Sequence, residues 1–225
     1  MTLLHVHCGD EAAAVARRAR LPGDVLAWRD SSAVGPCSVD PATHRQLRAG
    51  WWSVPAEGLQ AAADMRHDGE IALWFGPDPW EQLALVEVLA GAPAGTHAIV
   101  PLDRGVGTLQ PADLPARFER RGPAAGLAAL CGGIWREVCA DDRAALARRV
   151  ETLRAEPRLP HLPLALTRIL EDRRDGRTAR QVRQILADGV RDLPTVMSRL
   201  HAMEHPAHGV WYGDAIVRRL IDEAD

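Results

Sequence analysis

The segment from Ile71 to Leu89 constrains the fold more than any other part of the sequence. Its first five residues, Ile71 to Phe75, are all apolar, which is typical of a strand buried on both faces. A short turn with two prolines then contains Asp78, a suitable N-cap for a helix with proline at its first position. Apolar residues recur near the helical period up to Leu89. A buried strand that leads into a helix is half of a βαβ unit, in which ligands bind where strands end and helices begin.

The rest of the N-terminal half repeats this order of strand, turn and helix. Further strands are predicted at residues 3–8, 24–28 and 96–102. A helix is predicted at residues 11–20, with Gly9 permitting a tight turn and Asp10 as the N-cap. Residues 41–63 have a helical pattern that breaks near residues 51–55. Strands that alternate with helices form parallel sheets, so we predict an α/β fold with an N-terminal parallel sheet of about four strands and flanking helices.

The C-terminal half has helical patterns and no further predicted strand. Helices are predicted at residues 111–120, 122–138, 141–155, 164–173, 178–186, 193–203 and 214–222. A proline-rich segment at residues 156–163 is the strongest linker signal in the chain. We therefore predict an α/β ligand-site domain at residues 1–155 and an all-helical C-terminal domain at residues 156–225.

The composition is that of an ordinary soluble globular protein, with 225 residues of which 47% are hydrophobic and 25% charged. A net charge of −3 provides no overall field that would attract nucleic acid or an anionic membrane. No apolar run approaches the roughly 18 residues of a transmembrane helix, and the N-terminus lacks a signal-peptide pattern. These features predict a cytoplasmic protein that does not enter a membrane. All 27 basic residues are arginine, so every basic contact can be bidentate.

The four cysteines, Cys8, Cys37, Cys131 and Cys139, include no C-x-x-C pair. A disulfide framework is not expected in a chain with this much potential core. Cys131 and Cys139 lie eight residues apart in a predicted helix and are interpreted as packing residues. Cys8 and Cys37 could meet a metal together with a histidine of the first strand, but their spacing matches no known zinc motif, so no metal site is predicted.

Each of the four predicted strands is followed by an aspartate in the next turn. These residues are Asp10, Asp30, Asp78 and Asp103. In a parallel sheet all four carboxylates would lie at the same carboxyl edge. Because aspartate is common in caps and turns, a purely structural role is the main alternative for Asp10 and Asp78. Asp30 is different, because a loop follows it and Arg29 precedes it, and this favours a site role.

We predict a site for a small polar, anionic ligand at this edge. Asp30, Asp78 and Glu81 are the candidates for acid–base catalysis, and clustered carboxylates could equally bind Mg²⁺ or ligand hydroxyls. The candidates for ligand binding are Gly9, Asp10, Arg29 and Gln82, in which Arg29 supplies the charge opposite to an anion. No cofactor is identified, since the turn at Gly9 is neither a P-loop nor a dinucleotide-binding fingerprint.

Several of these residues belong to a set with a recognisable pattern. The set is Gly9-Asp10, Trp28-Arg29-Asp30, Gly35-Pro36, Trp74-Phe75, Asp78, Glu81-Gln82-Leu83, Trp135, Arg183-Gln184-Ile185-Leu186 and Gly213-Asp214. It resembles a bacterial family known as domain of unknown function 1835, with a C-terminal companion domain numbered 3658. Glu81 stands where that family usually has aspartate, and Gln181-Val182 stand where it usually has Thr-Glu. The resemblance covers most of the chain and implies no established activity.

The C-terminal helices leave a second function open. Residues 178–186 and 193–203 have the proportions of a helix-turn-helix, and residues 209–213 could form a hairpin wing, as in a transcriptional regulator. From Glu156 to the end, however, eleven arginines are balanced by eleven acidic residues, whereas DNA binding needs a basic face. A third interpretation is that these helices pack on the α/β part or form a homodimer. Trp51-Trp52 is interpreted as core or interface, and His161 as a surface residue of the linker.

Overall fold

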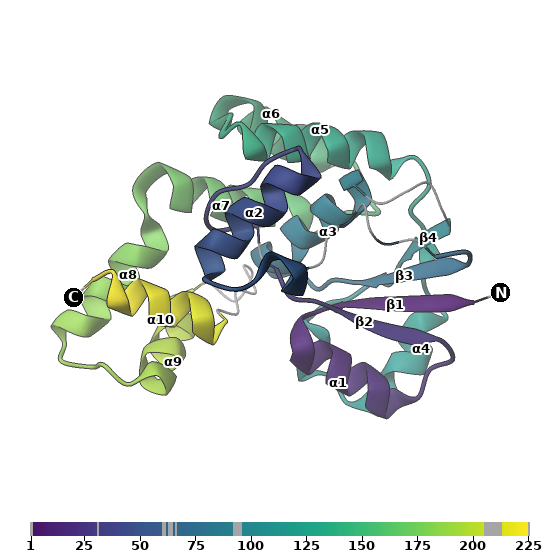
Figure 1. Cartoon of the computed structure of the whole chain (residues 1–225), viewed down its shortest axis with the longest axis horizontal. Helices are drawn as coiled ribbons and strands as arrows, with labels where there is room; N and C mark the ends of the chain where they lie inside the picture. Colours follow the sequence, from purple (N-terminus) through teal and green to yellow (C-terminus); the bar gives the residue numbers. More distant parts are fainter. Residues whose placement is uncertain are drawn as a thin grey trace.

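The fold is built around one sheet in the computed structural model, which describes residues 2–30, 32–59, 62, 65, 67–91, 96–204 and 213–224. Within these residues five strands pair in the order β2–β1–β3–β4–β5 (Figure 1). They are β1 (Leu3–Cys8), β2 (Asp24–Trp28), β3 (Glu70–Trp74), β4 (Thr96–Ile99) and β5 (Gly122–Pro123). The first four strands are parallel, which confirms the predicted α/β fold with a parallel sheet of about four strands. The two-residue strand β5 pairs antiparallel with β4.

Helices cover both faces of the sheet. On one face lie α1 (Gly9–Ala19), the 3₁₀ turns η3 (Val106–Thr108) and η4 (Pro111–Asp113), and α4 (Leu114–Phe118). On the other face lie α3 (Pro79–Gly91) and α5 (Leu127–Cys139), with α2 (Pro41–Trp52) near them (Figure 1). Side chains of β3 alternate between the two cores: Leu73 packs on the α3 side and Trp74 on the α1 side.

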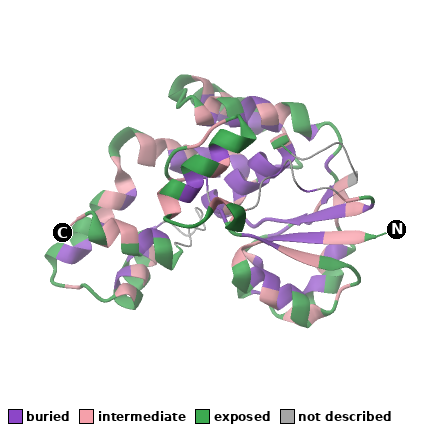
Figure 2. Cartoon of the chain, viewed as in Figure 1, coloured by how far each residue is buried: buried purple, intermediate pink, exposed green. Residues whose placement is uncertain are grey.

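Helix α3 is the centre of the larger core. Every residue from Pro79 to Leu89 is buried except Glu81, which is partly buried, as the colours in Figure 2 illustrate for this region. A helix that is apolar around its whole circumference has no side suited to water and must be covered on all sides. Here α5 and α7 supply that cover, which confirms that the segment from β3 through α3 organises the fold.

The helices after α5 divide between two cores. Helices α6 (Arg143–Leu153) and α7 (Leu162–Asp175) pack with α3 and α5, and Leu162 and Leu166 belong to the same core as Leu83. After Gly176 come α8 (Arg177–Ala187), α9 (Leu193–Met203) and α10 (Asp214–Asp222), which form a separate cluster at the C-terminal end of the molecule (Figure 1). Trp80 from α3 and Trp52 from α2 join this cluster to the α/β part. The division into two domains at residue 156 stays a prediction.

Two local predictions were wrong. Helix α1 begins at Gly9 rather than after an Asp10 cap, because Cys8 is its N-cap residue and makes no side-chain capping bond. Residues 122–126 are not helical, because Gly122 and Pro123 pair with β4 and Gly126 adopts a left-handed conformation with φ 81° before α5 begins. The predicted break after Trp52 is confirmed: Ser53 ends α2, and the 3₁₀ turn η1 (Ala56–Gly58) follows Pro55. Among the described residues no helix has the length and apolarity needed to cross a bilayer.

Candidate functional site

The predicted site residues follow strands whose carboxyl ends coincide. Cys8 pairs with Trp28 across β1 and β2, and His7 pairs with Trp74 across β1 and β3. The chain leaves β1 toward β2 on one side, whereas β3 lies on its other side, so a topological switch point falls between β1 and β3. Gly9, Asp30 and Asp78 therefore lie along one edge. Their side chains nevertheless separate into three groups with different environments.

The first group is an exposed ion pair between Asp10 and Arg29. Arg29 Nη2 lies 2.9 Å from Asp10 Oδ1, and both side chains are more than half exposed. The hydrogen bond from Arg29 lowers the pKa of Asp10 below its ordinary value. Because this carboxylate and guanidinium already neutralise each other in solvent, the pair contributes little attraction for a further charge.

The second group surrounds Asp30, which is buried. Its carboxylate accepts hydrogen bonds from Arg48 Nε at 2.9 and 3.0 Å, from Arg48 Nη2 at 2.7 Å and from Trp52 Nε1 at 2.8 Å. Arg48 is fully buried as well, and its Nη1 donates to the carbonyl oxygens of Val34 and Pro36. The Asp30–Arg48 pair thereby joins the end of β2, helix α2 and the loop between them.

Three further polar residues lie beside this pair, and sequence analysis did not select them as a site. Ser32 Oγ donates to Glu87 Oε2 at 2.6 Å, and His44 Nε2 lies 3.3 Å from Glu87 Oε1 and 3.9 Å from Asp30 Oδ2. All of them are buried. The sequence did contain a signal for Glu87, a single carboxylate in the otherwise apolar second half of α3, since a charge there requires a buried partner.

The third group closes the turn between β3 and α3. Glu81 Oε2 accepts a hydrogen bond from the Gly76 N–H at 2.6 Å, and Gln82 Nε2 donates to the Gly76 carbonyl at 2.7 Å. Asp78 Oδ1 accepts from the Trp80 N–H at 2.7 Å, which confirms the predicted helix cap. A Cβ at Gly76 would lie 2.9 Å from Gly105 Cα, so the turn packs directly on the loop after β4. Burial raises the pKa of Glu81 to about 7, against the opposing effect of the Gly76 hydrogen bond.

Two large cavities lie near this edge of the described structure, and neither is lined by Asp30, Asp78 or Glu81. The first, here called the edge cavity, has a volume of about 640 Å³ at the end of β4. Its lining comprises Phe75, Gln82, Leu85, Ile99, Val100, Pro101, Leu102, Asp103, Arg117, Arg120, Gly122, Pro123, Ala125, Pro157, Arg158, Leu159, Pro160 and His161. Of the residues predicted for ligand binding, Gln82 lines this cavity and Gly9, Asp10 and Arg29 do not.

The edge cavity is lined by both apolar and basic residues. Phe75, Leu85 and Leu102 are among the apolar residues, whereas three arginines and a histidine stand against a single aspartate. His161 was interpreted as a surface linker residue, but it is only partly exposed, and its Nε2 lies 2.8 Å from the carbonyl oxygen of Leu102. That contact fastens the segment before α7 to the end of β4. No local pattern in the sequence indicates it, since the two residues are far apart along the chain.

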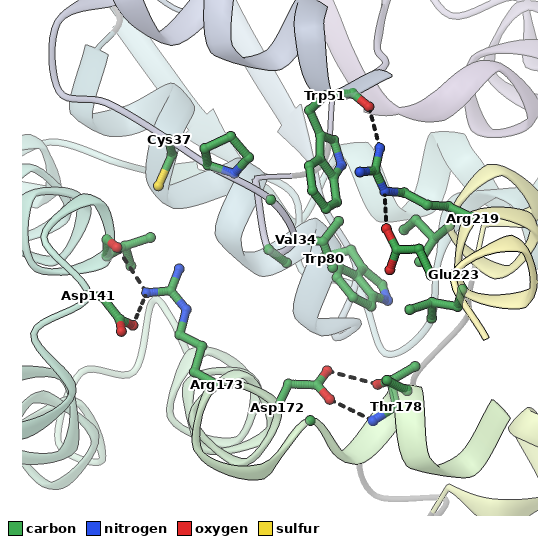
Figure 3. Close-up of a pocket in the computed structure, with 18 of the residues that line it drawn as sticks. Val34, Cys37, Trp51, Trp80, Asp141, Asp172, Arg173, Thr178, Arg219 and Glu223 are labelled. Atoms are coloured by element: carbon green, nitrogen blue, oxygen red, sulfur yellow. Dashed lines mark hydrogen bonds and ion pairs between the residues drawn. The ribbon is translucent and has the colours of Figure 1, made fainter. Parts of the chain in front are cut away.

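The second cavity, here called the tryptophan cavity, has a volume of about 500 Å³ between α2, α7, α8 and α10 (Figure 3). Trp51, Trp52 and Trp80 line it, which confirms Trp51-Trp52 as an interface between the α/β part and the last helices. Arg219 stacks over the Trp51 ring at 3.5 Å and donates to the Trp51 carbonyl. Opposite, Arg173 pairs with Asp141 at 3.1 Å. The charged residues that line the tryptophan cavity therefore pair largely with one another.

Metal binding and nucleic-acid binding were also considered for this chain, and the described residues support neither. No group of three or more His, Cys, Asp or Glu side chains is placed to hold a metal there. In the helical tail Arg199 pairs with Asp188 at 2.9 Å and Arg180 with Asp175 at 3.4 Å, so these cations are already neutralised. Of the hairpin wing predicted at residues 209–213, only Gly213 lies within the described part of the chain.

Comparison of the chain with protein-family models, curated proteins and solved structures found no match. The resemblance to domain of unknown function 1835 and its companion stays a prediction. Function is therefore inferred from the geometry of the cavities.

Proposed function

We propose that the protein binds a small organic anion in the edge cavity. The observation that supports this is the charge of its lining: Arg117, Arg120 and Arg158 face the cavity, and Asp103 is the one acidic residue among its described lining residues. Guanidinium groups bind carboxylates and phosphates in a bidentate geometry and remain charged at any physiological pH. The cavity volume lies within the range of about 300–1,000 Å³ that is usual for small-molecule sites.

The three arginines differ in how far the protein already neutralises them. Arg117 Nη1 lies 2.8 Å from Asp103 Oδ1, and Arg158 Nη2 lies 2.7 Å from Glu156 Oε2. Arg120 makes no ion pair with any residue that the structure describes. It is therefore the cation that an incoming anion would neutralise first, with Arg117 as the second donor once Asp103 turns to solvent.

Two helix N-termini add to the positive potential. Ala125 precedes α5 and His161 is the N-cap residue of α7, and both residues line the cavity. The aligned peptide dipoles of a helix place a partial positive charge at its N-terminus, which favours an anion within about one turn. Phe75, Leu85 and Leu102 would contact the apolar part of the ligand, so we expect an acid with an apolar body rather than inorganic phosphate.

The proposed site is at the same edge of the sheet as the predicted one, but at the end of β4 rather than between the ends of the first three strands. Asp30, Asp78 and Glu81 do not line it. The proposal therefore concerns binding, and a catalytic role for these three residues is no part of it.

A thermal-shift screen of organic carboxylates and phosphate esters tests the proposal, followed by calorimetric titration of each hit. A ligand at 100 times its Kd should stabilise the protein by about 2.7 kcal/mol. Arg120→Gln, expected to weaken binding about tenfold, should remove about half of that stabilisation at the same ligand concentration. Arg199→Gln, which removes the same charge from an exposed arginine of α9, should retain it. Hits that stabilise both variants equally would show that the anion binds elsewhere, and a screen without hits among organic acids would count against the proposal.

A further inference from the structure

Cys37 and Cys139 lie together in the wall of the tryptophan cavity. Cys37 belongs to the loop after β2, and Cys139 is the last residue of α5, so the fold brings together thiols that are distant in sequence. Both side chains are partly exposed and neither forms a disulfide. They pack against the same hydrophobic core, and each thiol is close enough to shift the pKa of the other. From its place in a predicted helix, eight residues after Cys131, Cys139 was interpreted as a packing residue, and no spacing rule connects it with Cys37.

The charges around the two thiols are unequal. The hydrogen bond from Cys139 lowers the pKa of Cys37 to about 7, helped by Arg173 from α7 and by His44 and Arg48 from α2, while burial opposes the shift. The pKa of Cys139 is raised by its hydrogen bond to Cys37 and by burial, and Glu87 adds to this. Cys37 therefore ionises first, and Cys139 keeps its proton while the thiolate is next to it.

The two remaining cysteines have the opposite character. Cys131 is fully buried, and burial raises its pKa to about 12. Burial also raises the pKa of Cys8 well above its ordinary value, and the carboxylates of Glu81 and Asp78 raise it further. Thiolates are the nucleophilic form of cysteine, so Cys8 and Cys131 are expected to be inert and serve as internal controls.

We propose that Cys37 and Cys139 are a reversible oxidation site that reacts with hydroperoxides entering the tryptophan cavity. The Cys37 thiolate attacks the terminal peroxide oxygen; the S–O bond forms, the O–O bond breaks, and the leaving alkoxide takes up a proton to become an alcohol, or water in the case of hydrogen peroxide. The Cys139 thiol then attacks the Cys37 sulfur; the S–S bond forms, the S–O bond breaks, and water leaves. Two thiols lose two electrons, and the peroxide gains them.

The disulfide would change the cavity itself. Val34, Gly35, Pro36 and Cys37 form one part of its wall, and a bond from Cys37 to Cys139 would tie that loop to the end of α5. Hydrogen bonds from Arg48 to two of its carbonyls already attach the same loop to α2. Oxidation therefore links the redox state to the shape of the space between α2 and the C-terminal helices.

The first test uses the unmodified protein and needs no variant. Timed alkylation with iodoacetamide at pH 7, followed by peptide mass mapping, should label Cys37 first, about five times faster than an unperturbed exposed thiol once its lower nucleophilicity is included. Cys8 and Cys131 should react more slowly than Cys37. Labelling of either control as fast as Cys37 would overturn the proposal.

The second test follows oxidation. Substoichiometric hydrogen peroxide on the native full-length protein should yield a Cys37–Cys139 disulfide that dithiothreitol reverses. In Cys139→Ser the reaction should stop at a sulfenic acid on Cys37, trapped by dimedone, whereas Cys37→Ser should leave Cys139 as a thiol. Cys131→Ser should behave as wild type. The proposal fails if peroxide leaves the pair reduced, or if the disulfide forms in denaturant but not in the folded protein.

Discussion

Charged residues follow both β2 and β4 at the same edge of the sheet, but their environments are opposite. After β2, Asp30 is 3% exposed and accepts hydrogen bonds from Arg48 and Trp52. After β4, the side chain of Asp103 is 60% exposed and pairs with Arg117, beside Arg120, which forms no ion pair with a described residue. The buried charges of Asp30 and Arg48 hold a loop in place, whereas the exposed charges after β4 remain able to bind a ligand. A carboxylate at a strand end is thus a poor guide to a site unless its partners are known.

The largest predicted effect concerns the buried pair. Asp30→Asn leaves the Arg48 guanidinium buried without a full counter-charge, and breaking a buried ion pair typically costs about 3–5 kcal/mol. We expect the free energy of unfolding, measured by urea denaturation at pH 7, to fall by about that amount.

Asp103→Asn is the matched control, because it makes the same chemical change in an exposed pair after β4. An exposed ion pair contributes no more than about 1 kcal/mol, so the midpoint of unfolding should move little. Equal losses of unfolding free energy in Asp30→Asn and Asp103→Asn would show that the pair after β2 is no more important for stability than the exposed pair after β4.

The second prediction concerns Glu81, whose folded-state pKa is raised from 4.5 to about 7 by burial. A carboxyl group with a raised folded pKa binds its proton more tightly in the folded state than in the unfolded state. Its contribution to stability is therefore complete below about pH 4.5 and is lost as the pH rises through 7, a change of about 3 kcal/mol.

Glu81→Gln removes this titration while keeping an oxygen that can accept the Gly76 N–H. The difference in unfolding free energy between variant and wild type should therefore shift in favour of the variant between pH 4.5 and 7. Taking the difference at each pH cancels the other titrating groups, among them His7, whose pKa burial lowers to about 3. A difference that does not change with pH would show that Glu81 is ionised normally in the folded protein.

Much of the fold could be predicted from sequence because its signals are local. The predicted bounds of β1, β2, α9 and α10 match the structure, since short apolar runs and capping residues determine where these elements begin and end. Asp192, for example, accepts the Thr195 N–H at 3.0 Å and starts α9. Strand β5 could not be predicted, because a two-residue strand has no periodicity and depends on β4 for its hydrogen bonds.

The candidate site was less predictable, because its residues come from distant segments. The edge of the sheet followed from the strand pattern, and so did the cap at Asp78. The partner of Asp30 did not, since Arg48 lies on the next helix and reaches back only after α2 has packed. The edge cavity likewise requires α4 and the segment before α7 to lie beside β4, which no sequence period encodes.

The third prediction concerns ligand binding by Arg120 in the edge cavity. For an organic anion that binds the edge cavity, Arg120→Gln should weaken binding about tenfold, or about 1.4 kcal/mol, because a hydrogen bond to a charged group is lost. Arg120→Lys keeps the charge without the planar fork and should lose less. Calorimetric titration at two salt concentrations would measure both effects, and an unchanged Kd in Arg120→Gln would exclude this arginine from the site.

The smallest expected effect is at the Asp10–Arg29 pair, which belongs to neither a buried network nor a cavity. Both side chains are more than half exposed, so water screens their attraction and the pair contributes less than about 1 kcal/mol. Asp10→Asn should lower the unfolding free energy by no more than this, and added salt should reduce the difference further. The variant should also retain full affinity for a ligand of the edge cavity, measured by the same titration. A loss of affinity in Asp10→Asn but not in Arg120→Gln would move the binding site back to the ends of the first three strands, where the sequence predicted it.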